Sequence, residues 1–179
     1  MKKFNIFKIV ILVVCFIALI GLFLPYERSI GEYRQSLKDN PTRMNIEEVN
    51  FKNKDVVDIS IIENFKVYSY TMNNSSGNDW MQGESIINVI ITIALIVSII
   101  LIILFALLNK SVLTIIFSIV MGISSLLMNY DIVDRGVIPS SKYTYGLTYY
   151  LYIPLAIIIL VCSIVNIINN KKQKKNNVN

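Results

Sequence analysis

The feature that most constrains this chain is a set of long apolar runs that contain no Asp, Glu, Lys or Arg. Four of them occur, at residues 9–25, 86–108, 111–128 and 147–168. A helix needs about 20 mostly apolar residues to cross a hydrocarbon core of about 30 Å. Because lipid offers the backbone no hydrogen bonds, continuous runs favour helices over the alternating strands of a barrel. The runs predict an all-α membrane protein built on a transmembrane four-helix bundle.

The composition agrees with a bilayer as the solvent. Hydrophobic residues make up 54% of the 179 residues, which is more than a soluble domain of this length buries. The net charge of +5 invites a nucleic-acid interpretation, but the placement of the charges argues against it. Lys171, Lys172, Lys174 and Lys175 follow the last apolar run directly, where lysines anchor a helix and contact anionic headgroups. We therefore expect the lipid bilayer, and no nucleic acid, as their partner.

The basic residues also predict the orientation of the chain. Residues 1–8, the link 109–110 and the tail 169–179 carry lysines and no acidic residue, and such segments stay in the cytoplasm. Both termini are therefore expected on the cytoplasmic side of the cell membrane, with residues 26–85 and 129–146 on the extracytoplasmic side. A cleaved signal peptide is the alternative for the first run, but no small-x-small cleavage site follows that run.

The longer extracytoplasmic segment is expected to contain a small β-hairpin. β-Branched and aromatic residues are interleaved with polar ones, which predicts strands over 56–62 and 65–70 with a turn at Glu63–Asn64. A hairpin by itself is marginally stable in water. Val49 and Phe51 would supply a third strand that covers it.

The rest of this segment is predicted as a helix, a loop and a contact surface. A short helix over 30–38 is expected to end before Pro41, because the residue before a proline avoids helical geometry. Residues 73–79 are rich in turn formers and predict a surface loop. The segment is the expected seat of specificity, and its candidate partner-contact residues are Phe65, Tyr68 and Tyr70.

Aromatic and basic residues mark the ends of the spans. Tryptophan and tyrosine prefer the headgroup level, and lysines anchor the cytoplasmic end. The predicted membrane-interface residues are Trp80, Tyr145, Tyr149, Tyr150, Lys171 and Lys172. An aromatic platform for a sugar or a peptide is the alternative interpretation of the tyrosines.

Small residues indicate which faces of the helices meet. Helices in lipid associate through close backbone approach rather than hydrophobic expulsion. The predicted helix-packing residues are Ala94, Ser98, Ser118, Gly122 and Ser125. Pro154 removes one backbone hydrogen bond and is expected to kink the last span. Cys15 and Cys162 lie within spans, at different depths, and are expected to be free thiols.

Catalytic chemistry has little support in the sequence. The chain has no histidine, and it has no phosphate loop, dinucleotide fingerprint or metal-spaced carboxylate set. No catalytic, cofactor-binding or metal-ligating residue is therefore predicted, and we expect no enzyme and no cofactor. An enzyme that acts on lipid or cell wall is the weakest alternative.

The favoured function is that of a non-enzymatic membrane interaction protein, either an accessory subunit or an immunity-type protein. Its partner would be another membrane or extracytoplasmic protein, or a second copy of itself. The alternative is a small oligomeric channel or transporter, for which Pro154, Asn88 and Asn166 are the only support. The absence of charged residues from the spans argues against ion-coupled transport.

Three segments resemble a pattern of small four-span membrane proteins from low-GC Gram-positive bacteria. They are Gly-Leu-Phe-Leu-Pro-Tyr at 21–26, Asp-Trp at 79–80 and Tyr-Gly-Leu-Thr-Tyr-Tyr at 145–150. The layout also resembles the claudin architecture, in which a β-bearing outer segment sits on a left-handed four-helix bundle. That likeness is architectural only, because the Trp-Gly-Leu-Trp pattern and outer cysteine pair of claudins are absent. The resemblance implies the four-span layout and carries over no function.

Overall fold

The structure is a computed structural model that describes residues 6–74 and 79–176, and the side chains of residues 6–74 and 82–171. Its internal contacts divide the chain into two compact units. We call the first the bundle unit; it comprises Met1–Ile20, Ala94–Ser125 and Tyr152–Asn179. We call the second the αβ unit; it comprises Gly21–Ile93 and Leu126–Leu151.

Most described residues are helical, and three helices are long and apolar enough to cross a membrane. Their apolar spans are Gln82–Leu107 of α4 (Asp79–Leu107), Ser111–Asp134, which is α5, and Leu147–Lys171 of α6 (Leu147–Asn176). The last three predicted runs lie in these helices, except for Leu108, which lies in the turn after α4. The chain thus has the helices of a multi-pass membrane protein.

The first predicted run forms a shorter helix. α1 (Ile6–Gly21) has 16 residues and reaches about 24 Å at 1.5 Å per residue. It ends before the predicted boundary at residue 25, because the backbone turns after Gly21 and enters a strand at Pro25.

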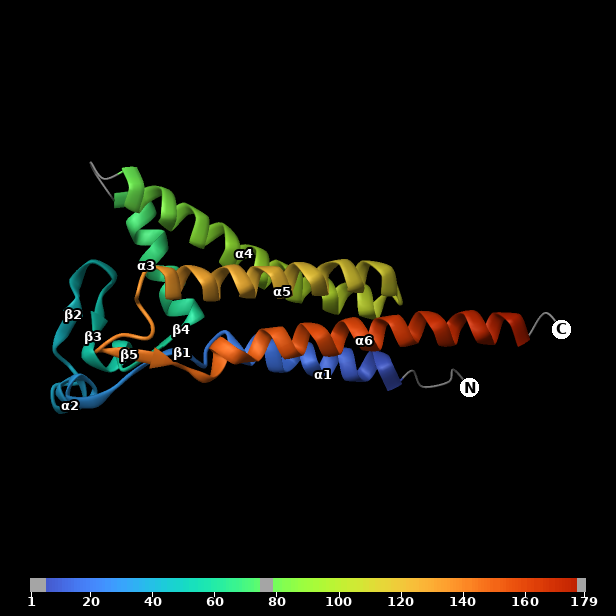
Figure 1. The fold of residues 1–179 in the computed structure, drawn as a ribbon, viewed down its shortest axis with the longest axis horizontal. Helices are drawn as coiled ribbons and strands as arrows, with labels where there is room; N and C mark the ends of the chain where they lie inside the picture. The colour runs from blue at the N-terminus through green and yellow to red at the C-terminus, as the bar shows by residue number, and fades with distance from the viewer. Residues whose placement is uncertain (1–5, 75–78, 177–179) are drawn as a thin grey trace. The chain divides into compact units, whose positions relative to one another are not determined.

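Helices of the bundle unit are joined by contacts between residues far apart in the sequence. The Tyr152 hydroxyl of α6 donates a hydrogen bond to the Ala18 carbonyl of α1 at 3.0 Å, and these helices lie side by side in Figure 1. Lys8 Nζ of α1 donates to the Leu107 carbonyl at the end of α4 at 2.9 Å. Cys15 and Cys162 are free thiols, as predicted.

A tight turn connects α4 to α5, as the short link predicts. Asn109 adopts the left-handed conformation at φ 56°, and its N–H donates to the Ala106 carbonyl at 3.2 Å. The Lys110 N–H donates to the Phe105 carbonyl at 2.8 Å. This pair of bonds is a Schellman motif, which satisfies carbonyls that the helix end leaves unpaired. Phe105 also stacks on Phe117 of α5, with ring centroids 5.5 Å apart.

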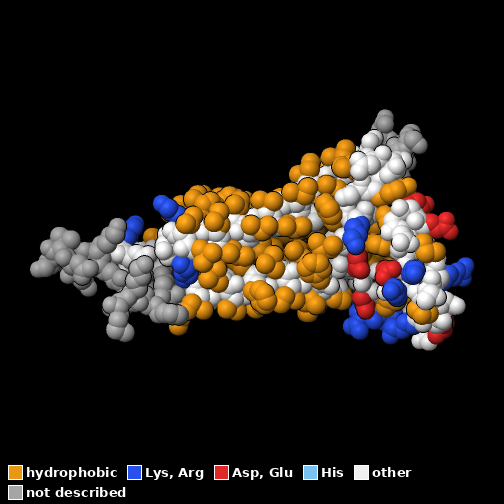
Figure 2. Space-filling model, turned by 180° about the vertical axis from the view of Figure 1, so that it is seen from behind, with side chains coloured by type: hydrophobic (Ala, Val, Ile, Leu, Met, Phe, Trp, Pro, Cys, Tyr) orange, Lys and Arg blue, Asp and Glu red, His pale blue; other side chains and the backbone are white. Residues whose placement is uncertain are grey.

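Large apolar side chains cover the outside of the bundle-unit helices. On the face drawn in Figure 2, hydrophobic side chains extend along these helices. The exposed ones include Phe16, Val97, Ile100, Ile116, Ile157 and Val161. A continuous apolar surface of this kind marks a membrane or protein contact, since water would disfavour it.

The αβ unit contains a three-stranded antiparallel sheet in the order β4-β1-β5. Its strands are β1 (Pro25–Ser29), β4 (Asp58–Ser60) and β5 (Tyr143–Tyr145). The residue after β5 is Gly146, whose N–H donates to the Tyr26 carbonyl at 2.9 Å. A Cβ atom on Gly146 would lie 2.3 Å from the Pro25 carbonyl oxygen. Only glycine therefore allows the chain to pass this close to β1.

A small apolar core lies between further elements of the αβ unit. These elements are α2 (Gly31–Asp39), β2 (Met44–Ile46), η1 (Glu47–Val49), β3 (Phe51–Lys52) and η2 (Asn53–Val56). Leu37, Phe51 and Val56 are buried together at its centre. The helix predicted over 30–38 is confirmed as α2.

The predicted hairpin over 56–62 and 65–70 is wrong, although a small hairpin exists between β2 and β3. Residues Ile61–Asn74 form the helix α3. The Ser60 N–H donates to Glu63 Oε2 at 2.6 Å, and the Glu63 N–H donates to Ser60 Oγ at 3.2 Å. This reciprocal pair is a capping box, which starts a helix where the sequence interpretation placed a turn.

Other predicted boundaries also differ from the structure. Val49 lies in the 3-10 helix η1, and only Phe51 of the two predicted third-strand residues lies in a strand. α5 continues to Asp134, so the predicted loop 129–146 begins within a helix. The predicted loop 73–79 lies partly in α3 and α4, and residues 75–78 lie outside the described residues.

Candidate functional site

A β-bulge in the αβ unit turns the side chain of Glu27 inward. Along β1, Pro25 and Glu27 pair with consecutive residues of β4, so β1 holds one extra residue over this stretch. An extra residue interrupts the alternation of side chains between the two faces of a strand. Tyr26 and Glu27 are consequently both buried, each 3% exposed.

The buried Glu27 carboxyl group has one direct polar partner on α3. Glu27 Oε1 accepts a hydrogen bond from Asn64 Nδ2 at 2.6 Å. Burial raises the pKa of Glu27 to about 7, although the Asn64 hydrogen bond and the charge of Arg135 act in the opposite direction. Desolvation disfavours the carboxylate more than these partners stabilise it. This carboxyl group therefore changes its charge near neutral pH.

The end of α5 places Arg135 in the same unit. Gly136 adopts the left-handed conformation at φ 66°, and its N–H donates to the Val133 carbonyl at 2.9 Å. The Val137 N–H donates to the Ile132 carbonyl at 3.1 Å. These two bonds form a second Schellman motif. The motif fixes the backbone directly after Arg135 and therefore limits where its side chain reaches.

The Arg135 guanidinium connects α5 to α3. Its Nη2 donates to Asp131 Oδ2, one helical turn earlier, and to the Tyr68 hydroxyl. The guanidinium also lies over the Tyr68 ring, 5.1 Å from the ring centroid. Burial raises the pKa of Tyr68 to about 12, although Arg135 lowers it. Tyr68 therefore keeps its proton at neutral pH and is a poor general base.

One donor of this cluster has no partner. Among the described residues, the buried Arg135 Nε has no hydrogen-bond acceptor. An unsatisfied buried donor costs about 1 to 3 kcal/mol. Such donors are rare in native structures, and a functional site is one reason for their presence.

A groove of about 420 Å³ lies beside this cluster within the αβ unit. It is lined by Val67, Tyr68, Thr71, Glu84, Ser85, Arg135 and Val137. A carboxylate and a guanidinium thus share the groove with hydroxyl groups and two valines. This set offers both donors and acceptors beside apolar surface, which suits an extended polypeptide better than a small apolar ligand.

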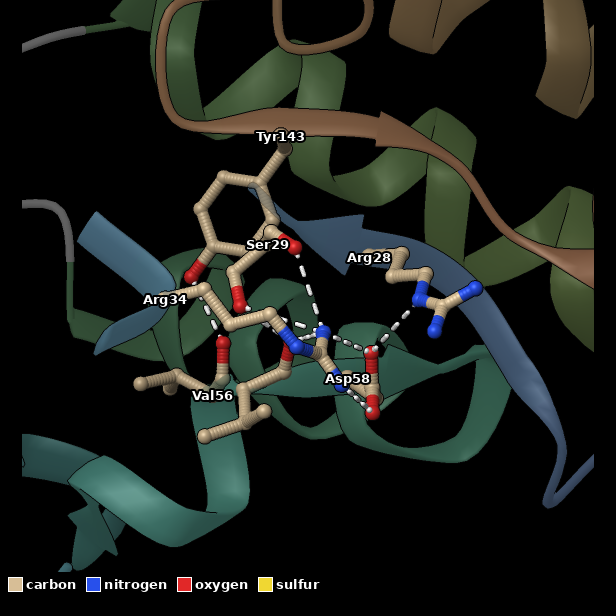
Figure 3. Close-up of polar contacts among 7 residues, drawn as sticks. Arg28, Ser29, Arg34, Val56, Asp58 and Tyr143 are labelled. Atoms are coloured by element: carbon tan, nitrogen blue, oxygen red, sulfur yellow. Dashed lines mark hydrogen bonds and ion pairs between the residues drawn. The ribbon is translucent and has the colours of Figure 1, made fainter. Parts of the chain in front are cut away.

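A second polar cluster, shown in Figure 3, has a structural role. Arg34 of α2 binds Asp58 of β4 through two hydrogen bonds of 2.7 and 2.9 Å. The Tyr143 hydroxyl of β5 donates to the Val56 carbonyl at 2.8 Å. Arg28 approaches Asp58 only to 3.9 Å, and its side chain is 61% exposed. The bidentate pair therefore holds α2 on the sheet, whereas Arg28 contributes little.

The predicted helix-packing residues are all described. Those that are buried are Ser98, Ser118 and Ser125, and Ala94 and Gly122 are half-buried. A Cβ atom on Gly122 would lie 3.5 Å from the Ala156 Cβ atom, which is ordinary contact. α5 and α6 therefore approach each other at Gly122 with room for a methyl group.

The predicted interface tyrosines pack against one another. The ring centroid of Tyr149 lies 4.5 Å from that of Tyr145 and 4.9 Å from that of Tyr150. Tyr150 is 59% exposed. Such a cluster is expected both of a headgroup belt and of an aromatic platform.

The remaining predicted site residues have different environments. Tyr68 lies in the groove, Phe65 is half-buried, and Tyr70 is exposed on α3. Lys171 is exposed near the end of α6. Trp80 and Lys172 lie in α4 and α6, and their side chains lie outside the described residues.

No protein-family model matches the chain, and no curated protein or solved structure matches it. The function must therefore be argued from the residues themselves. Sequence reasoning missed Glu27, Asn64 and Arg135. Glycine directly after Arg135 is a helix-end signal, but no local pattern relates these residues to Tyr68.

Proposed function

We propose that this chain is a four-span integral membrane protein that binds another protein and catalyses no reaction. Its outer groove, within the αβ unit, would hold an extended segment of a membrane or extracytoplasmic partner or of a second copy. An accessory subunit and an immunity-type protein both fit this description. The four-span layout is the one that the resemblance to small membrane proteins of low-GC Gram-positive bacteria implies.

The contacts of α1 support a fourth span. Ile11, Val14 and Cys15 are buried in the bundle unit, whereas Val13 and Phe16 on the same helix are exposed by 53% and 62%. This pattern is expected of a helix with one face on its neighbours and the other in lipid. A helix of about 24 Å is accommodated by local thinning of the bilayer or by flanking apolar residues.

The charge distribution supports cytoplasmic termini. All 12 Asp and Glu residues fall in the segments of the αβ unit, and the segments of the bundle unit contain lysine as their only charged residue. Segments that carry lysines next to apolar spans are retained in the cytoplasm. The segments 26–85 and 129–146 of the αβ unit would then be extracytoplasmic.

The groove carries the proposal of an interaction role. It brings Glu84 and Arg135 together with the hydroxyls of Thr71 and Ser85, so a bound backbone would find both acceptors and donors. Tyr68 keeps its proton at neutral pH, and Glu27, whose pKa is raised to about 7, is not among the described residues that line the groove. Both observations argue against acid–base chemistry at the groove wall. Binding explains this set of residues better than catalysis does.

Site-directed photocrosslinking tests this proposal in living cells. A photoreactive amino acid at Thr71, inside the groove, is expected to give one adduct of discrete mass. The same amino acid at the exposed Glu48 of η1 serves as the control and is expected to give none. Arg135→Gln should remove the Thr71 adduct. No adduct at Thr71, or identical adducts at both positions, would contradict the proposal.

The channel alternative has less support than the sequence suggested. Asn88 Nδ2 donates to the Glu84 carbonyl of its own helix at 3.0 Å, and Asn166 Nδ2 donates to Ser111 Oγ at 2.9 Å. Both amides therefore serve contacts within the chain. Purified protein in liposomes is expected to release no ion or dye, and rapid release would favour the channel.

A further inference from the structure

A cavity of about 310 Å³ lies in the bundle unit where the α4–α5 turn meets the last part of α6. It belongs to neither polar cluster of the αβ unit. Its wall combines two lysines, Lys110 and Lys171, with Ser111 and with the apolar residues Val112, Leu113 and Ile167. Charge and apolar surface therefore occur in one cavity at the end of two membrane-spanning helices.

The charged side of this cavity is suited to a phosphate group. Lys110 is held by the Schellman motif of the turn, and its carbonyl accepts the Thr114 N–H at 3.1 Å to begin α5. The first N–H groups of a helix have no partner within that helix, and its N-terminus carries a partial positive charge. Anions bind readily at such a place, and here two lysine ammonium groups add to it.

The apolar side of the cavity distinguishes a lipid from free phosphate. Val112 is 63% exposed and lines the same cavity as Leu113 and Ile167. A soluble phosphate ion gains nothing from these side chains, whereas the glycerol and acyl chains of a phospholipid bury against them. Basic pockets between membrane helices on the cytoplasmic side are recognised by anionic headgroups in this way.

A third lysine at the same end of the bundle unit has a different contact. Lys8 Nζ donates to the Leu107 carbonyl in the last turn of α4 at 2.9 Å, and Lys8 does not line the cavity. It carries the same charge as Lys110 and Lys171. This gives a matched control, because general attraction to an anionic membrane treats all three lysines alike.

We propose that this cavity binds one anionic phospholipid, with its phosphodiester between Lys110 and Lys171 and its acyl chains against Val112, Leu113 and Ile167. With the orientation proposed above, the lipid comes from the cytoplasmic leaflet. The bound lipid would link the α4–α5 turn to α6.

Native mass spectrometry of the full chain tests the site. The detergent-purified, delipidated protein is incubated with phosphatidylglycerol or with phosphatidylcholine, and the retained lipid per monomer is measured. Phosphatidylglycerol is expected to be retained at least about tenfold better. Lys110→Gln and Lys171→Gln should each lower its retention about fivefold, and Lys8→Gln by less than about twofold.

Lys110→Arg separates loss of charge from loss of fold, because it keeps the cation and should keep the lipid. Millimolar inorganic phosphate should leave the bound lipid in place, since phosphate lacks the acyl contacts. Equal retention of the two lipids would overturn the proposal. An equal loss in Lys8→Gln, or displacement of the lipid by phosphate, would overturn it as well.

Discussion

The serine and threonine hydroxyls of the bundle helices are used differently from the buried charged groups of the αβ unit. In the bundle unit, the hydroxyls of Ser98, Ser118 and Thr114 donate to carbonyls three or four residues earlier in the chain. In the αβ unit, the hydrogen bond from Asn64 to Glu27 joins positions 37 residues apart. The bond from Arg135 to Tyr68 joins positions 67 residues apart. These hydroxyls satisfy their own helices, and the bundle helices are joined by separate bonds such as that from Tyr152 to Ala18. In the αβ unit, buried charged side chains bond to other elements and so help determine which elements meet.

This difference predicts how each unit responds to substitution. In lipid the backbone bonds of a helix meet no competing water, so a substitution that fits its space leaves them in place. A small sheet with a core of a few residues depends on each long-range contact. Amide hydrogen exchange, followed separately on peptides from each unit, measures this directly because it reports local opening.

The largest effect is expected for Gly146→Ala. The added methyl group would lie 2.3 Å from the Pro25 carbonyl oxygen, so β5 must separate from β1. We expect a loss of more than about 4 kcal/mol in the stability of the αβ unit. Gly83→Ala, where a Cβ atom meets nothing within 4 Å, is the control and should be neutral or slightly stabilising. Similar exchange rates in the two variants would contradict the packing at Gly146.

Loss of the bidentate ion pair comes next. Arg34→Met leaves Asp58 without its two short hydrogen bonds and removes the link between α2 and β4. We expect a loss of about 3 kcal/mol, the lower end for breaking a buried pair, because both side chains are partly exposed. Arg28→Met removes the same charge from the longer contact and should cost less than about 1 kcal/mol. Equal losses of stability in Arg34→Met and Arg28→Met would contradict the importance of the two short hydrogen bonds.

A smaller effect is expected from pH. The pKa of Glu27 is raised from 4.5 to about 7 by burial, so between these values the folded chain holds a proton that the unfolded chain releases. The stability of the αβ unit should therefore fall as pH rises through this window, by on the order of 2 kcal/mol from pH 5 to pH 8. Glu27→Gln should flatten the profile, whereas Glu32→Gln on the exposed face of α2 should leave it unchanged. A flat wild-type profile would contradict the role of burial.

The smallest effect is expected in the bundle unit. In Gly122→Ala the new methyl group lies at ordinary contact distance from Ala156, and alanine is a better helix former than glycine. Stability should change by less than about 1 kcal/mol in either direction. Gly122→Leu, which cannot fit in that space, should loosen the peptides of α5 and α6. Faster exchange of the α5 and α6 peptides in Gly122→Ala would show that the bundle unit responds to substitution as strongly as the αβ unit.

The same contrast explains what the sequence could predict. Hydrocarbon solvates charged side chains poorly, so a membrane span is a long run without them. The length of such runs alone located α4, α5 and α6. The tight turn at Asn109–Lys110 followed from the shortness of the link.

The αβ unit follows from pairings that no local pattern contains. A bulge in β1 buries Glu27. Asn64, which donates a hydrogen bond to Glu27, lies on the helix α3. The alternation of residues 56–70 had predicted a hairpin there. The Ser60–Glu63 capping box was readable in the sequence, and it outweighs β-propensity over α3. The proximity of Arg135 to Tyr68 was not readable, because tertiary packing alone brings them together.

Cysteine labelling in intact cells tests the central claim, which is four spans with both ends in the cytoplasm. In a chain that carries Cys15→Ala and Cys162→Ala, single cysteines are placed by Lys3→Cys, Arg43→Cys, Ser141→Cys and Asn170→Cys. A membrane-impermeant maleimide should label positions 43 and 141 in intact cells, and positions 3 and 170 only after permeabilisation. Labelling of position 3 in intact cells would leave α1 outside the bilayer and contradict the four-span account.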